Sequence, residues 1–450
     1  MEHDHVMQLL DISKNCPTIR PSLRVTEREM RAAACLGKAL VGNTLIEALH
    51  LTLATRTSLE REEMGDIARF ISSSGSLKVL ELNDNRLSSD SSSNFYSIVG
   101  MLLDAAARSS SIQLLRLGSE CAPPSLSQLL QRASSGGNGI KELWMEAPRR
   151  WLNILNLRCV ESLCLTSLDS LDQESRDALF AAPQEDNAPA GTPDLLKRLF
   201  IDQWSHGLPR LLFSRCPSLE ELYLKNVDFC HPTLGTTSLI CDLLWGLMGS
   251  KTTTLLSFNE CEFDYLAMMK LLETLQSRLT SITRLHFIDS TDNFVSEHLY
   301  GLLSLDTLTS LKIDFFRGNG TEVIDENIHI VRDAIAASNL TKLHVSSCNM
   351  SALIGALTIP ITTQSLSILH FGNYTLMDRQ GTAALVGLLN NPNSRLEELS
   401  LSHCDYSQYQ ESLPSILQAL TTEGPQLERL SLAPTSNAED QLYIFHSLLP

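Results

Sequence analysis

Residues 77–87 read LKVLELNDNRL, with leucines at Leu77, Leu80 and Leu82 and an asparagine at Asn85. The same spacing recurs in LTKLHVSSCNM at 340–350, LSILHFGNYTL at 366–376 and LEELSLSHCDY at 396–406. Apolar residues that alternate with polar ones are typical of a short strand that buries one face. Because the whole pattern recurs, it predicts a repeated structural unit.

The apolar-x-x-apolar-x-apolar core of this pattern occurs fourteen times along the chain, once in degenerate form. The cores start at Ile46, Leu77, Ile112, Ile140, Val160, Leu196, Leu219, Thr253 (degenerate), Ile282, Leu308, Leu340, Leu366, Leu396 and Leu427. From residue 46 to residue 427 is 381 residues, which divide into 13 intervals of about 29 residues. The intervals vary from 20 to 36 residues, and near residue 150 the segment LNILNL at Leu152 competes with VESLCL at Val160.

Between the cores, the chain shows helical spacing. Met64, Ile67, Ala68 and Ile71 lie at i, i+3, i+4 and i+7, and the apolar residues of 266–275 and 413–420 continue this theme. The predicted unit is therefore a strand, a turn and a helix. Such units stack so that each buries its apolar face against its neighbours, with parallel strands on one side and helices on the other.

By its motif and repeat length, the sequence resembles the leucine-rich-repeat superfamily, and within it the ribonuclease-inhibitor-like class. The resemblance implies an α/β solenoid shaped like a horseshoe, with parallel strands on the concave face and helices on the convex face. We expect a short N-terminal cap at residues 1–21 and a single solenoid of about fourteen irregular repeats at 22–450. The segment AAPQEDNAPAGTPD at 181–194 reads as an inserted loop, which is either a solvated insertion or a docking loop.

Composition excludes several classes of function. The 450 residues include 81 leucines, and 35 basic against 52 acidic side chains give a formal net charge of −17. This balance argues against nucleic-acid and membrane-surface binding, and no apolar run is long enough to span a membrane. Eleven cysteines without a C-x-x-C pair, and no basic, apolar leader, indicate a reduced cytoplasmic protein, with the nucleus as an alternative.

Catalytic signatures are missing from the sequence. It contains no phosphate-binding loop, zinc-protease, nucleophile-elbow or kinase motif, so we expect a non-enzyme without cofactor or metal. The resemblance gives a structural role to residues in the Asn/Cys position of the repeat, where a small polar group bonds the backbone at the turn. These residues are Asn85, Cys261, Cys348 and Cys404.

The residue between the second and third apolar positions of each core should point onto the concave face. Two neighbourhoods along this row are candidate partner-binding sites. The first combines Trp144, Phe200 and Tyr223 with Arg198 and Glu221, which is a composition typical of protein-binding hot spots. Alternatively, Trp144 or Phe200 is tucked under the neighbouring insertion.

The second neighbourhood contains His286, Lys312, His344 and His370, flanked by Lys342 and Arg284. It predicts a basic-to-neutral ridge that accepts an acidic peptide and gains charge below about pH 6.5. Alternatively, it is an ordinary solvated polar face.

Together these observations predict a monomeric intracellular scaffold or adaptor that binds a protein partner on its concave face. The alternative is a regulator of an enzyme, either resembling a GTPase-activating protein or serving as the substrate adaptor of a ubiquitin ligase. A nuclease inhibitor is a weaker alternative.

Overall fold

The computed structural model describes part of the chain, and all structural statements below concern that part. The described residues are 22–25, 40, 43–54, 64–85, 93–118, 121, 126, 129–130, 139–146, 159–170, 174, 195–204, 216–230, 239–290, 295–314, 328–347, 366–372, 375, 377–401, 404–405, 411–421 and 427–431. The expected cap at 1–21, the loop at 181–194, Cys348 and the side chain of Asn85 lie outside this description.

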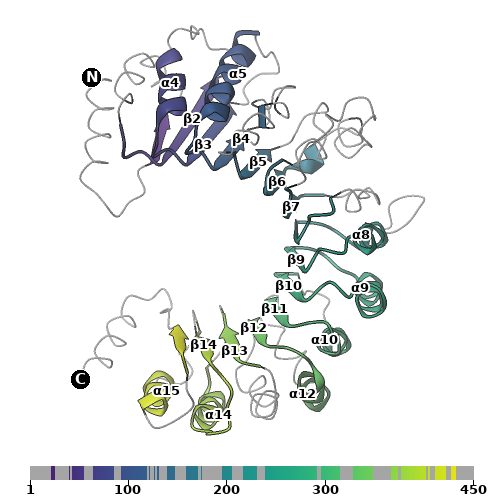
Figure 1. Ribbon diagram of the computed structural model, residues 1–450. Helices are drawn as coiled ribbons and strands as arrows, with labels where there is room; N and C mark the ends of the chain where they lie inside the picture. Colours follow the sequence, from purple (N-terminus) through teal and green to yellow (C-terminus); the bar gives the residue numbers. More distant parts are fainter. Residues whose placement is uncertain are drawn as a thin grey trace. The chain divides into compact units, whose positions relative to one another are not determined.

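The chain forms two compact units, which we describe separately. Unit 1 comprises residues 1–204 and 215–219, and unit 2 comprises residues 205–214 and 220–450. Both are α/β structures with parallel strands (Figure 1).

In unit 1 seven strands pair in chain order, each parallel to the next. They are β1 (Ser22–Val25), β2 (Ala48–Ala54), β3 (Val79–Asn85), β4 (Leu114–Leu117), β5 (Glu142–Glu146), β6 (Ser162–Thr166) and β7 (Arg198–Asp202). The helices α4 (Gly65–Ser73) and α5 (Ser93–Arg108) lie between the early strands in the sequence, and the short helix η2 (Leu168–Ser170) follows β6.

In unit 2 eight strands pair in the same way. They are β8 (Glu221–Lys225), β9 (Leu255–Asn259), β10 (Arg284–Ile288), β11 (Ser310–Asp314), β12 (Lys342–Ser346), β13 (Ile368–Phe371), β14 (Glu398–Leu401) and β15 (Arg429–Ser431). The described helices of this unit are α8 (Leu239–Met248), α9 (Tyr265–Ser277), α10 (Ser296–Leu303), α12 (Ile328–Ala337), α14 (Arg379–Leu389) and α15 (Ser412–Thr421). In each unit the described helices lie on the same side of the strands (Figure 1).

Each of the fourteen predicted cores carries a strand, from β2 to β15. Of the two candidate cores near residue 150, VESLCL at Val160 forms the strand, because β6 begins at Ser162. One strand, β1, was not predicted. Its register with β2 pairs Leu23 with Leu49, so the first apolar position of its core would fall three residues earlier, at Arg20. Because Arg20 is charged, the apolar pattern does not mark a core at this strand.

Burial follows the alternation that the sequence predicts. From β2 to β14 the two apolar positions within each strand are at most 3 % exposed, as at Leu49 and Leu51 or Leu285 and Phe287. In β15 the equivalent Leu430 is 39 % exposed, so the described core ends there. The helical spacing is also confirmed, since Met64, Ile67 and Ile71 are fully buried. Burial of leucine-sized side chains, at about 2 kcal/mol each, stabilises the stacked units.

The backbone repeats as well. Within the described ranges, six non-glycine residues have positive φ between 48° and 59°, and each directly follows a strand. They are Ser167, Gln203, Asn226, Glu260, Asp289 and Ser347. Left-handed backbone costs a non-glycine residue about 1 kcal/mol or more. Its recurrence at one place in the repeat indicates that each turn is held by the packing of its neighbours.

Among the described helices, none is long and apolar enough to cross a membrane.

Candidate functional site

The row of residues that the sequence predicts to face outward is in register in both units, although three of its members, Cys164, Ser257 and Ser400, are buried. Each member pairs directly with the corresponding member of the next strand. In unit 1 the row is His50, Glu81, Arg116, Trp144, Cys164 and Phe200, and in unit 2 it is Tyr223, Ser257, His286, Lys312, His344, His370, Ser400 and Ser431. Neighbouring members are therefore about 5 Å apart.

At the beginning of the row, four side chains form one network centred on Glu81. Its carboxylate lies 2.7 Å from His50 Nδ1, accepts a hydrogen bond of 2.6 Å from Asn83 Nδ2 and lies 3.7 Å from Arg116 Nη1. Burial alone would raise the pKa of Glu81, but Asn83, His50 and Arg116 together hold it below its usual value. The acid is therefore ionised and internally satisfied at neutral pH.

The guanidinium of Arg116 also lies over the ring of Trp144, with 4.7 Å from its carbon to the ring centroid. This cation–π contact holds the indole in a fixed place, and Trp144 is still 36 % exposed. Trp144 and Phe200 are not neighbours, because the strand of Cys164 lies between them. Arg198 lies 3.3 Å from Glu142, which is two residues before Trp144. The alternative that Trp144 is tucked under the neighbouring insertion does not hold for this exposed side chain, and Phe200 is half-buried.

The other two members of the first neighbourhood lie in unit 2 and contact each other. The hydroxyl of Tyr223 donates a hydrogen bond of 2.8 Å to Glu221, and Arg284 lies 2.9 Å from the same carboxylate. Glu221 thus links Tyr223 to Arg284 within unit 2.

The second neighbourhood is brought together as predicted. His286, Lys312, His344 and His370 lie on four adjacent strands in direct register. The rings of His344 and His370 meet edge to face with 5.8 Å between centroids. His344 Nε2 shares a hydrogen bond of 3.2 Å with Ser346, and His370 Nε2 lies 2.8 Å from Glu398.

The expected gain of charge below pH 6.5 is wrong for two of these histidines. Burial, and then the charge of Lys312, lower the pKa of His286 to about 4 and that of His344 to about 3. The sequence pattern could not foresee this, because it gives the spacing of the imidazoles but not how far they are removed from water. Both rings are neutral at physiological pH.

Close to His344, Gly372 leaves no room for a Cβ atom unless neighbouring side chains move. A Cβ atom on Gly372 would lie 2.2 Å from Ser346 Oγ and 2.9 Å from His344 Nε2. Gly372 directly follows β13. The backbone at the end of β13 therefore comes close to the side chains of His344 and Ser346 on β12.

Two of the cysteines in the Asn/Cys position of the repeat are described, and both are buried. The thiol of Cys261 donates hydrogen bonds of 3.4 Å to the carbonyl oxygens of Leu224 and Asn259. Burial raises the pKa of Cys404 to about 12. The thiol of Cys261 thus links the turn after β9 to the backbone of β8 and β9.

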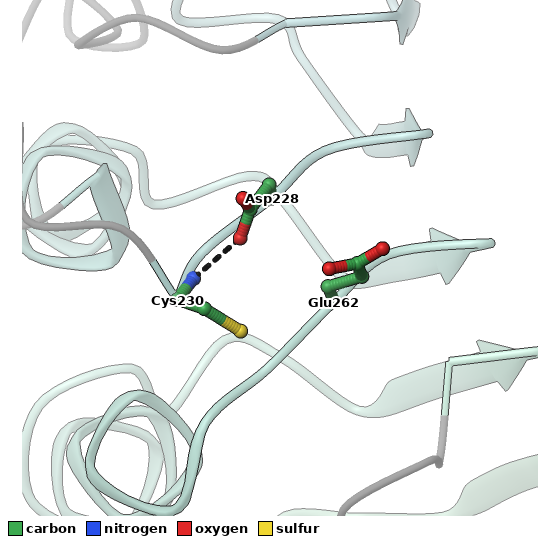
Figure 2. Close-up of side chains that lie close together, drawn as sticks. All are labelled: Asp228, Cys230 and Glu262. Carbon is green, nitrogen blue, oxygen red and sulfur yellow. Dashed lines mark hydrogen bonds between the residues drawn. The ribbon is translucent and has the colours of Figure 1, made fainter.

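A group that the sequence analysis missed is formed by Asp228, Cys230 and Glu262. Their side-chain ligand atoms lie within 4.8 Å of one another, and Asp228 also accepts a hydrogen bond of 2.7 Å from the amide of Cys230 (Figure 2). A parallel bridge between Asp228 and Glu262 joins segments far apart in the sequence, which no local motif reveals. Burial and the surrounding carboxylates raise the pKa of Cys230 to about 12. The thiol would have to lose this proton to bind a divalent metal.

The helices carry exposed apolar side chains that the sequence analysis also missed. They are Trp245 on α8, Tyr265, Leu266 and Met269 on α9, and Tyr300 on α10, with exposed fractions between 39 % and 74 %. We call these residues the helix-side patch. Because α9 contacts both α8 and α10, the patch is a second candidate surface for a protein partner.

No protein-family model and no curated protein matches this chain. The assignment of function therefore depends on the residues themselves.

Proposed function

We propose that this protein is a leucine-rich-repeat solenoid of the ribonuclease-inhibitor-like class that works as a non-catalytic scaffold or adaptor. In this proposal a protein partner binds to the outward side of the parallel strands, which is the concave face of a horseshoe. The proposed location is the cytoplasm, with the nucleus as an alternative, and binding requires no cofactor.

The observation that carries the proposal is the in-register row of polar and aromatic side chains along the strands of each unit. Parallel strands hold these side chains rigidly, so little conformational entropy is lost when a partner binds. Trp144, fixed by Arg116 but still exposed, has the properties of a binding anchor.

The pairing of the carboxylates along the row also favours binding over catalysis. Glu81 is held by His50 and Arg116, and Glu398 by His370 and Arg429. The half-buried, neutral ring of His344 shares its Nε2 hydrogen bond with the hydroxyl of Ser346. Such an arrangement provides fixed donors and acceptors for recognition.

Affinity capture from native extract, followed by mass spectrometry, tests the proposal. The bait variant combines Trp144→Ala, Tyr223→Ala and His344→Ala. The matched control combines Trp245→Ala, Leu266→Ala and Tyr300→Ala on the helix-side patch. We expect the strand variant to lose partners that the intact chain and the control retain.

As a control, circular dichroism of both variants tests whether they are folded. If the strand variant retains every partner and the helix-side variant loses them, the partner binds the helices and the proposal fails.

A further inference from the structure

In unit 2 the side of β10–β13 that carries the row differs in charge from the rest of this acidic protein. We call this area the lysine–histidine surface. It consists of Arg284, His286, Lys312, Lys342, His344 and His370. Three of the six side chains are permanently cationic, whereas the chain as a whole carries a net charge of −17.

Two of the cations have no ion-pair partner within the described part of the chain, although Lys312 and Lys342 interact electrostatically at longer range with Asp314 and Glu398. Arg284 is paired with Glu221 at 2.9 Å, but neither Lys312 nor Lys342 has an ion-pair or hydrogen-bond partner among the described residues. The nearby carboxylates are engaged elsewhere. Glu398 lies 2.8 Å from His370, and Asp314 accepts a hydrogen bond of 3.1 Å from Ser347.

The positive field of the two lysines reaches the neighbouring imidazoles. Lys312 and Lys342 both lower the pKa of His286 and of His344, in addition to the larger effect of burial. The two rings therefore remain neutral and offer N–H groups beside the charged ammonium groups. Fixed N–H donors between two lysines are complementary to carboxylate oxygens.

The spacing of the lysines indicates the shape of the ligand. Lys342 pairs with Ser310, which lies two residues before Lys312 on the adjacent strand. From strand geometry the two Cα atoms are about 8 Å apart. In an extended peptide, side chains at i and i+2 are separated by about 7 Å and point the same way.

We infer that the lysine–histidine surface binds an extended acidic segment of a protein partner, with two carboxylates at i and i+2 engaging Lys312 and Lys342. This inference rests on the proposed function and adds the chemistry of the partner. Nucleic acid is the less favoured ligand, because only three cations gather here and the net charge of the chain repels a phosphate backbone.

Fluorescence anisotropy with three labelled probes tests the inference on the full chain. The first probe is a short peptide with glutamate at alternate positions, the second is its glutamine counterpart, and the third is a single-stranded RNA oligonucleotide. The test variant is Lys312→Gln with Lys342→Gln. The matched control is Lys141→Gln with Lys251→Gln, which removes the same charge from two exposed lysines outside the surface.

We expect the glutamate peptide alone to bind, with an affinity that falls as salt rises. The test variant should weaken binding about tenfold, and the control should change it by less than about twofold. The inference is overturned if the peptide does not bind, if both variants weaken it equally, or if the RNA binds more tightly with the same dependence on the two lysines. If the peptide fails while capture of a partner still depends on the row, the inference fails and the proposed function stands.

Discussion

The burial of His344 has a consequence for stability that is measurable. In the folded chain its pKa is about 3, against an ordinary value of 6.5. Because the pKa of His344 is lower in the folded chain than in the unfolded chain, the free energy of unfolding is highest above pH 6.5. It decreases as the pH falls from 6.5 toward 3. At about pH 5, the unfolded chain binds a proton at His344 and the folded chain does not. The free energy of unfolding therefore falls by about 2 kcal/mol between about pH 7 and about pH 5.

Nuclear magnetic resonance of the chain with selectively labelled histidines measures the pKa directly. The His344→Gln variant assigns the signal among the 12 histidines. We expect the His344 signal to remain that of a neutral imidazole down to about pH 4, and His286 to titrate with a midpoint of about 4.

Hydrogen exchange measures the energetic effect at the strand itself. For amides of β12, the opening free energy should fall by about 2 kcal/mol more in the natural chain than in His344→Gln between about pH 7 and about pH 5. Amides of β3 in unit 1 serve as the internal reference. A His344 signal that titrates near 6.5, or equal pH dependence in both chains, would refute the reasoning.

Three further predictions concern single residues. Cys230 should react with iodoacetamide near neutral pH far more slowly than a free thiol does, because its pKa is about 12, and peptide mass spectrometry would detect an equal rate as a contradiction. Gln203→Gly should stabilise the fold by about 0.5–1 kcal/mol in thermal unfolding, because φ is 59° there; a lower melting temperature would contradict this. Gly372→Ala should displace His344 and Ser346 and shift the His344 signal, whereas an unchanged signal would show that the contact is absent.

Much of the fold could be predicted from the sequence because the apolar spacing and the burial have the same cause. From β2 to β14 each core buries its second and third apolar positions, so these strands follow from the spacing of apolar residues alone. The fifteenth, β1, was missed because Arg20 stands where the pattern requires an apolar residue. Strand alternation also predicted which residues share the outward row, since it depends only on the pleat.

The interactions within the row were less predictable, because they depend on side-chain reach and on burial. The sequence placed His50, Glu81 and Arg116 in one row but could not show that the carboxylate of Glu81 lies close to both neighbours. It also placed His286 and His344 correctly, yet their charge was wrong because periodicity says nothing about desolvation.

Site-specific photo-crosslinking is the most direct test that a partner binds the outward side of the strands. One form of the chain carries a photo-reactive phenylalanine derivative in place of Ser310, which lies on β11 beside the row. The other carries it in place of Gln276, which is exposed on α9. After irradiation in native extract, we expect a protein adduct from position 310 that is absent from position 276. An adduct from position 276 alone would contradict the account.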